Sequence, residues 1–418
     1  MIPRPNASPK ATARPRSRAV PLRGTALGRG MSPQPRTIGV VSVSRADYAI
    51  CRPVLRRIQA DPALKLHLMI SGMHLSPEFG LTVTAIEADR FEIGERVEML
   101  LSSDSPAGIA KSMGLGVIGF AQAYARFRPD ILVVSGDRFE MHAAALAALP
   151  FNIPVAHIEG GDVTEGAIDD ALRHSITKLS HLHFVSTAEY ARRVVQLGEE
   201  AWRVTVSGAP SLDNVKSLTR LTRNELERKY GLPLEPPPLL VTFHPVTLEY
   251  EHTGEQMTEL LEALKAVHAP IVFTLPNADT HGRMMVQMIR EFVTNRPGVH
   301  LIDNLGVQGY LSMLSYVAAL VGNSSSGLIE APSFKLPVVN IGIRQRGRIK
   351  AANVIDVGYR RDEISQGIAK ALAPAFRDSL HHLVNPYGTG DASEKIVECL
   401  KTVPLSEHTL CKRFQDMG

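Results

Sequence analysis

Cysteine pairs, long apolar runs and metal-binding spacings are all scarce in this sequence. Its 418 residues hold only three cysteines, Cys51, Cys399 and Cys411, which lie far apart and form no CxxC pair. This spacing argues against a disulfide framework and against a structural zinc site. No apolar run reaches the roughly 18 residues of a membrane-spanning helix, so no membrane partner is expected. No secretory signal is recognisable, and we expect a cytoplasmic protein.

Acidic residues are missing from the first 36 positions. The lysines and arginines of residues 1–36 carry a charge of +8, whereas the whole chain carries +4, so residues 37–418 carry −4. The Pro/Arg-rich leader, residues 1–36, has no apolar period and is expected to be disordered. It is either a transit peptide or an extension ahead of a true start at Met31. The slightly acidic body argues against a nucleic-acid partner, which would require a local basic excess.

The body alternates short β-branched runs with segments of helical period, which is typical of parallel sheets covered by helices. Strands are expected at residues 38–43, 64–70, 130–136, 154–160, 182–186 and 203–208, and again at 239–245, 271–276, 299–303, 318–326 and 337–342. Apolar residues at spacings of three and four predict helices between them, for example at 46–60, 108–127 and 255–267. The predicted fold class is therefore α/β.

The length predicts two domains, at about 150 residues each. We expect two Rossmann-like domains over residues 37–215 and 216–388, because a Pro-rich stretch near 232–238 follows the first set of strands. A helix within 389–405 is expected to pack back onto the first domain. A tail, 406–418, follows it.

Polar residues stand where six of the predicted strands end. They are Arg45 and Asp47, Asp137 and Arg138, Glu159, His244, Asn277 and Asp279, and Asn323 to Ser326. Ligands of open parallel sheets bind beyond the carboxyl ends of strands, so this placement indicates a site. Taken singly, Asp47 and Asp137 are as well explained as helix caps, and His244 as a core histidine.

The stretch GNSSSGLIE, residues 322–330, combines a strand end with a Ser-rich turn and a predicted helix. Free N–H groups and the positive end of a helix dipole suit a phosphate. Ser324 and Ser325 add hydroxyl donors, and Glu330 is placed to accept from a ribose diol. The alternative is an ordinary Ser-capped helix.

Three histidines in the stretch 167–184 invite a metal interpretation. His174 falls on a predicted helix, and His181 and His183 alternate on the next strand, so the spacing brings no pair together as HExxH does. No metal is expected. Asp169 and Asp170 begin the same helix, and either is a cap or a catalytic carboxylate.

Seven motifs in this order resemble one known family. They are RADY at 45–48, GDRFE at 136–140, HIEGGDVTEGAIDDALRHSITKLSH at 157–181, FHPVT at 243–247, LPNAD at 275–279, GNSSSG at 322–327 and IGIRQRGR at 341–348. Together they resemble the hydrolysing UDP-N-acetylglucosamine 2-epimerases. The resemblance implies a glycosyltransferase-B-like pair of Rossmann domains, with a nucleotide sugar in the cleft between them and UDP on the second domain.

The resemblance also implies an activity and residue roles. The family releases UDP, inverts carbon 2 and frees N-acetylmannosamine for sialic-acid synthesis, without a cofactor; some relatives take UDP-2,4-diacetamido-2,4,6-trideoxy-glucose toward legionaminic acid. The family tends to form homo-oligomers. Matching motifs place the catalytic groups at Asp137, Glu159, Asp169 and His244, and UDP contacts at Arg45, Arg138, Asn277, Ser324, Ser325, Glu330 and Arg344.

The chemistry explains why several carboxylates are needed. Departure of UDP puts positive charge on carbon 1 and makes the proton on carbon 2 removable, so the leaving group must be stabilised first. One group then removes that proton, and another delivers a proton to the opposite face. A glycosyltransferase of the same architecture, a non-hydrolysing epimerase and a non-catalytic nucleotide-sugar sensor remain as alternatives.

Overall fold

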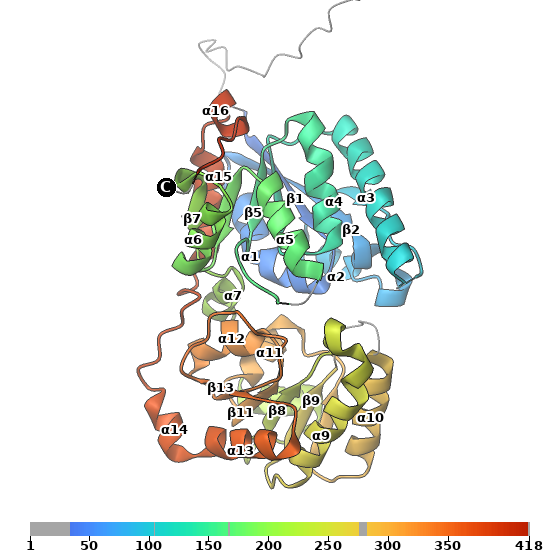
Figure 1. Ribbon diagram of the computed structural model, residues 1–418, viewed down its shortest axis with the longest axis vertical. Coiled ribbons are helices and arrows are strands. Elements are labelled where there is room, and N and C mark those ends of the chain that lie inside the picture. Colours follow the sequence, from blue (N-terminus) through green and yellow to red (C-terminus); the bar gives the residue numbers. More distant parts are fainter. Residues whose placement is uncertain (1–33, 104, 166–167, 276–281, 417–418) are drawn as a thin grey trace, which may run out of the picture. The chain divides into compact units, whose positions relative to one another are not determined.

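The computed structural model describes residues 34–103, 105–165, 168–275 and 282–416. Residues 1–33 of the expected leader lie outside the described residues. From Pro35 onward the chain forms one compact unit. It contains two parallel β-sheets covered by helices (Figure 1), which confirms the predicted α/β class.

The first sheet has seven parallel strands, and its order reverses between β1 and β4. In spatial order the strands are β3 (Ile93–Val97), β2 (Leu64–Ser71), β1 (Arg36–Ser42), β4 (Ile131–Ser135), β5 (Val155–Ile158), β6 (Leu182–Val185) and β7 (Val204–Val206). Because β1 pairs with β2 on one side and with β4 on the other, the loops after β1 and β4 leave in opposite directions. Such a reversal is where open α/β sheets bind ligands.

The second sheet repeats this plan with six parallel strands. Their order is β10 (Val299–Ile302), β9 (Ile271–Thr274), β8 (Leu239–Thr242), β11 (Ala319–Gly322), β12 (Val338–Ile341) and β13 (Val354–Val357). The order reverses between β8 and β11, which pair directly. The ends of these two strands therefore mark a second expected ligand position.

Central strands are continuously apolar because both of their faces are buried. In β4, Ile131 and Val133 belong to one core, whereas Leu132 and Val134 belong to the core on the other face. Parallel sheets covered on both sides require such runs. This is why the sequence pattern locates these strands.

Helices cover both faces of each sheet. Around the first sheet they are α1 (Arg45–Ala60), α2 (Val83–Ala88), α3 (Pro106–Arg126), α4 (Phe139–Ala148), α5 (Ile168–Leu179), α6 (Ala188–Gln196) and α7 (Ser211–Ser217). Around the second they are α8 (Arg223–Tyr230), α9 (Thr253–Lys265), α10 (Gly282–Thr294), α11 (Gly306–Met313), α12 (Ser326–Ile329), α13 (Arg361–Leu372) and α14 (Pro374–Ser379).

The chain ends beside the first sheet, with α15 (Ala392–Thr402) and α16 (Glu407–Leu410). Ile396 and Leu400 of α15 share a core with Val54 and Ile58 of α1. Lys401 of α15 also forms an ion pair with Asp61 at 2.9 Å. Figure 1 shows α15, in red, beside the elements of the first sheet. Among the described residues, none of the helices has the length and apolar character needed to cross a membrane.

Candidate active site

The turn after β4 presents Asp137, which the sequence predicts to be a catalytic residue. Gly136 adopts a φ of +73°, which a residue with a side chain rarely adopts. Its N–H donates to the carbonyl of Ile158 at 3.0 Å, so β5 fixes the turn. The helix-cap interpretation of Asp137 is wrong: Arg138 occupies the N-cap position of α4, and Asp137 pairs with Arg173 instead.

Arg173 contacts several of the groups beside Asp137, and it was not among the site residues predicted from the sequence. Its side chain is 2% exposed. Besides Asp137, its guanidinium donates to the carbonyl of Asp162 at 3.1 Å, to the Thr164 hydroxyl at 2.8 Å and to Asp170 at 3.4 Å. A planar guanidinium with five donors can hold several acceptors in fixed directions, which an ammonium group cannot.

Glu159 follows β5 and lies beside the same turn. A side chain added to Gly136 would come within 4.0 Å of the Glu159 carboxylate. Glu159 has a φ of +67°. This backbone conformation is strained for a residue with a side chain, and such strain is found often at functional sites. Burial raises the pKa of Glu159 to about 8, and the negative charges of Asp162 and Asp137 add to the rise. A carboxylic acid that keeps its proton at neutral pH can act as a general acid.

The segment between β12 and β13 of the second sheet completes this group. Arg348 donates to the carbonyl of Val163 at 3.3 Å and to the Thr164 hydroxyl at 3.5 Å. Burial raises the pKa of Asp162, while the charge of Arg348 opposes the rise. Asp162 and Arg348 lie inside motifs that carried the resemblance, yet neither was nominated, because only the folded chain shows that they meet.

Asp169 and Asp170 both lie in the first turn of α5, as expected. Asp170 accepts from the N–H of Thr164 at 2.8 Å and pairs with Arg173, so it stabilises the start of the helix. Asp169 is partly buried one residue earlier. Asp170 thus ties the loop before α5 to the helix, and the catalytic role of Asp169 stays a prediction.

Arg45 and Arg138 lie near the ends of β1 and β4, at the reversal of the first sheet. Arg45 is exposed at the first position of α1, whose start is capped by a reciprocal pair, Ser44 and Asp47. Capping thus accounts for Asp47. Arg138 forms two hydrogen bonds with Glu140, at 2.9 and 3.2 Å.

His74 is a further residue at this reversal that the sequence did not nominate. It lies just after β2 and contacts the hydroxyls of Ser42 at 3.0 Å and Thr82 at 2.7 Å. Burial lowers its pKa to about 4, and the charges of Arg138 and Arg45 lower it further. Its position after a predicted strand was the only signal available in the sequence.

The reversal of the second sheet joins His244 to the GNSSSG stretch. The N–H of His244 donates to the Asn323 side chain at 2.7 Å, and the amide of Asn323 donates to the carbonyl of His244 at 2.8 Å. Gly322 allows this approach, because a side chain there would overlap the carbonyl of Thr242 at 1.9 Å. Arg344 donates to the carbonyl of Asn323 at 3.1 Å.

His244 is held as a neutral imidazole. Burial lowers its pKa to about 3, and the positive charge of Arg344 contributes. A neutral ring retains one N–H donor, which suits contact with an anionic phosphate oxygen. The structure thus brings His244 and Arg344 together, as the site interpretation requires.

The helix expected after GNSSSG is only one turn long. Ser325 precedes α12 (Ser326–Ile329), a 3-10 turn at Ala331–Phe334 follows, and Pro332 prevents continuation of the helix. Its dipole is correspondingly weak, so hydroxyl and N–H donors carry more of any phosphate contact. Glu330 lies at the end of α12 instead of one to two turns inside a helix. Burial raises its pKa, and hydrogen bonds from Ser211 and Ser326 oppose the rise.

Asn277, a predicted UDP contact, lies outside the described residues.

Within the described ranges, no group of three or more His, Cys, Asp or Glu side chains is arranged to hold a metal ion. His174 lies 3.6 Å from Asp170, His181 accepts from the N–H of Val155 at 3.1 Å, and His183 contacts Glu199 at 3.0 Å.

The chain is similar to known proteins over most of its length. The sequence profile described as UDP-N-acetylglucosamine 2-epimerase matches residues 56–401. The "GDP/UDP-N,N'-diacetylbacillosamine 2-epimerase (hydrolyzing)" of Campylobacter jejuni is 39% identical over 385 residues, covering 91% of this chain and 99% of that protein. The "UDP-N,N'-diacetylbacillosamine 2-epimerase (hydrolyzing)" of Legionella pneumophila is 37% identical over 378 residues, covering 90% and 98%.

A solved structure shows the same fold at lower identity. The UDP-GlcNAc 2-epimerase of Neisseria meningitidis, bound to UDP-GlcNAc, superposes with a TM-score of 0.76 at 20% identity. The match covers 87% of this chain and 99% of that one. At this identity the likeness establishes the fold, and it confirms the two-sheet architecture.

Proposed function

We propose a function from one premise: the chain belongs to the UDP-N-acetylglucosamine 2-epimerase family. It is an enzyme of the hydrolysing UDP-sugar 2-epimerase type. The reaction that we assign to it releases UDP from a 2-acetamido sugar, inverts carbon 2 and yields the free sugar. The observation that carries this assignment is the convergence of Asp137 and Glu159 after the neighbouring strands β4 and β5, with Arg173 of α5 paired with Asp137.

The two carboxyl groups have environments suited to opposite tasks. Asp137 pairs with the Arg173 guanidinium and is partly exposed, so a substrate can reach its carboxylate. Burial raises the pKa of Glu159 to about 8, so that it holds a proton at neutral pH. We assign proton delivery to Glu159, which holds a proton at neutral pH, and proton removal to the accessible carboxylate of Asp137, because inversion needs one group for each face of the sugar ring.

The first half of the proposed reaction is an elimination. Asp137 takes the proton from carbon 2, the bond from carbon 1 to the diphosphate oxygen breaks, and UDP leaves with the electron pair. Arg138, Arg344, His244 and the Ser324–Ser325 turn are the proposed donors to the leaving diphosphate. Preorganised donors that face developing negative charge lower the barrier without reorganising.

The second half is a hydration. The elimination leaves a double bond between carbons 1 and 2. Water adds its oxygen to carbon 1, and carbon 2 receives a proton from Glu159 on the face opposite to the first transfer. Asp169, at the start of α5, is proposed to accept the proton that the water gives up as its oxygen bonds to carbon 1. The product is the free 2-epimer, and no redox cofactor is required for this balance.

The proposed substrate is UDP-2,4-diacetamido-2,4,6-trideoxy-glucose, the UDP-N,N'-diacetylbacillosamine of the two relatives above. Its product would be a precursor of legionaminic acid. UDP-N-acetylglucosamine, which the sequence suggested first, becomes the second candidate. It is supported by the description of the family and would yield N-acetylmannosamine for sialic acid. A cytoplasmic location and a homo-oligomeric state remain predictions.

One experiment separates these possibilities. The enzyme is incubated with each UDP-sugar in turn, first without and then with an added sugar acceptor, and the products are identified by NMR. We expect UDP and a free 2-epimer in stoichiometric amounts, with higher kcat/KM for the diacetamido sugar. Sugar that remains attached to UDP would indicate a non-hydrolysing epimerase. UDP release that depends on an added acceptor would indicate a glycosyltransferase, and tight binding without turnover a sensor.

A further inference from the structure

The C-terminal segment, residues 407–416, is bound against the first sheet by buried groups. Arg203, which is 1% exposed, donates to the carbonyls of His408 and Thr409 at 2.8 Å and to that of Cys411 at 3.2 Å. The N–H of Gln415 donates to the carbonyl of Gly198 at 2.9 Å. These contacts hold the backbone of the segment at fixed points, and so they fix the position of Lys412.

Lys412 uses its ammonium group to join three acceptors. It contacts the carbonyls of Lys178 at 2.8 Å and Ser180 at 2.6 Å, and the carboxylate of Glu199 at 2.7 Å. An ammonium group has three N–H donors, so the set is complete. The last carbonyls of a helix have no partner within it, and a cation there is favoured by the helix dipole. Lys412 therefore stabilises the C-terminal end of α5.

α5 is connected to the Gly136–Asp137 turn directly through Arg173 and indirectly through His157. Arg173 pairs with Asp137 directly. One turn further along, the Thr177 hydroxyl lies 3.2 Å from Nδ1 of His157, whose Nε2 lies 2.7 Å from the carbonyl of Gly136. Both connections run from α5 to the turn that presents Asp137.

The protonation of His157 follows from its partners. A carbonyl only accepts, so Nε2 of His157 carries the proton and donates to Gly136. Burial lowers the pKa of His157 to about 3, so the ring is neutral and Nδ1 is an acceptor that faces the Thr177 hydroxyl, which also donates to the carbonyl of Arg173 at 3.1 Å. This single tautomer links the turn to α5.

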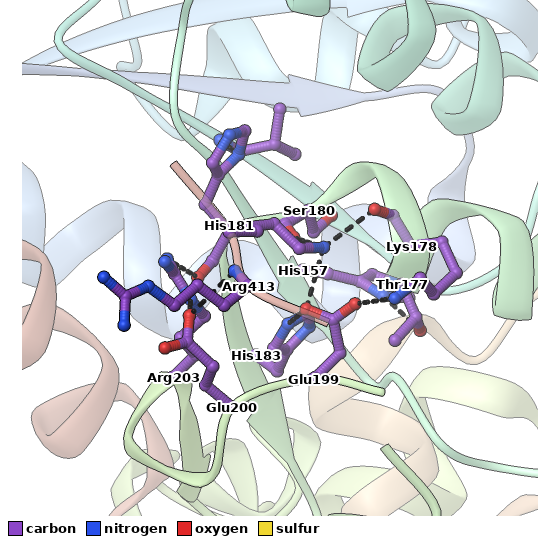
Figure 2. A network of polar contacts seen from close by, with 12 residues as sticks. His157, Thr177, Lys178, Ser180, His181, His183, Glu199, Glu200, Arg203 and Arg413 are labelled. Carbon is purple, nitrogen blue, oxygen red and sulfur yellow. Dashed lines mark hydrogen bonds and ion pairs between the residues drawn. The ribbon is translucent and has the colours of Figure 1, made fainter. Parts of the chain in front are cut away.

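Glu199 carries the second connection from Lys412 to the same place. It is fully buried, contacts Lys178 at 2.6 Å and accepts from Nε2 of His183 at 3.0 Å (Figure 2). His183 on β6 is the register partner of His157 on β5. Although burial raises the pKa of Glu199, hydrogen bonds from His183, Lys178 and Lys412 lower it to about 2. Glu199 is thus a fixed anion that anchors β6 beside His157.

We propose that Lys412 is a positioning residue for this site: by tying the end of α5 to Glu199, it holds the contacts of Thr177 and Arg173 that aim Asp137. Asp169 and Ser180 lie 11 residues apart, so at ~1.5 Å per residue Lys412 acts from about 16 Å beyond the start of α5. It acts through other residues and not on the substrate. The inference rests on the proposed function.

The test compares Lys412→Met with Lys412→Arg and with a matched control, Arg413→Met. Arg413 bears the same charge one residue later, its side chain is exposed, and its N–H contacts Glu200 at 3.3 Å. We expect Lys412→Met to lower kcat about 10-fold, with KM and UDP affinity within about twofold of the wild type. Lys412→Arg should recover most of kcat, and Arg413→Met should match the wild type. Equal kcat in Lys412→Met and Arg413→Met would overturn the proposal.

A readout without turnover separates this proposal from the proposed function. In ¹⁵N-histidine NMR at neutral pH, we expect the wild type and Arg413→Met to show the same protonated Nε2 resonance for His157. In Lys412→Met, that resonance should shift or broaden by exchange with water. If Lys412→Met does not fold, Lys412→Gln, which keeps two donors, takes its place. An unchanged His157 resonance contradicts the positioning role; a wild type that shows the resonance yet forms no free 2-epimer contradicts the proposed function alone.

Discussion

Arg173 of α5 and Asp137 of the turn after β4 form an ion pair, with a buried guanidinium and a carboxylate that is 26% exposed. The pair joins the helix that begins with Asp169 to the strand end that the sequence singled out. The exposed part of Asp137 leaves one side of the carboxylate accessible, while Arg173 fixes the other. The chemistry proposed for this carboxylate can be tested by a change that preserves its shape.

Asp137→Asn should lower turnover at least about 10²-fold, the usual size of a general acid–base contribution. The amide keeps an oxygen for Arg173 but is a far weaker base. UDP affinity should change little, because the proposed diphosphate donors lie on other residues. Steady-state kinetics and calorimetry of UDP binding measure the two effects separately.

The matched control lies at the other end of the same strand. Asp130 is exposed and accepts from the N–H of Thr37 at 2.8 Å, a contact that an asparagine oxygen can also make. Asp130→Asn should therefore retain wild-type turnover. Near-normal turnover in Asp137→Asn would remove Asp137 from the mechanism.

Arg173→Lys should destabilise the fold by about 2 kcal/mol. Breaking a fully buried ion pair costs about 3–5 kcal/mol, and the partial exposure of Asp137 together with the retained charge reduces this figure. A lysine cannot donate to all four of the acceptors that Arg173 contacts. Urea unfolding monitored by circular dichroism gives the free energy.

Arg126→Lys is the control for that substitution. Arg126 pairs with Glu95 at 2.7 Å, but its side chain is 57% exposed. Exposed pairs contribute at most about 1 kcal/mol, so this variant should lie within about 0.5 kcal/mol of the wild type. Equal stabilities for the Arg173 and Arg126 variants would show that Arg173 does not organise the site.

Glu159→Gln should gain stability over the wild type as the pH rises. Burial raises the pKa of Glu159 from 4.5 to about 8, so the folded state holds a proton that the unfolded state has released. Wild-type stability contributed by this group is therefore lost as the pH rises between those two values. The glutamine variant lacks this loss, and its advantage should grow across that window and level off above it.

Urea midpoints from about pH 5 to about pH 9 follow this difference directly. The variant should also lose most of its turnover, because glutamine cannot deliver the proton. A stability difference that is constant across the whole range would show that Glu159 titrates normally.

The central strands and their polar ends could be predicted because each property is local in the sequence. β4 and β8 are continuous apolar runs, and the residues that follow them, Asp137 and His244, need only the rule for parallel sheets. The edge strands β3 and β13 were missed. They contain the charged residues Glu95, Arg96 and Asp356, since an edge strand is solvated and needs no apolar run, and so they lack the pattern that predicts a buried strand.

The site residues that could not be predicted from the sequence depend on contacts between segments far apart in the chain. Arg348 reaches Val163 across 185 positions, and Lys412 reaches Ser180 across 232. Nothing in the local sequence separates these side chains from ordinary surface cations. The short length of α12 was not predicted either, although the sequence contains Pro332, which prevents the helix from continuing.

Isotope incorporation tests the central claim most directly. The enzyme is run in deuterated water with UDP-2,4-diacetamido-2,4,6-trideoxy-glucose, and in parallel with UDP-N-acetylglucosamine. Because the proton removed from carbon 2 is replaced from solvent, we expect one deuterium at carbon 2 of a released, inverted free sugar. A free sugar with protium at carbon 2, or a sugar still attached to UDP, would contradict this expectation.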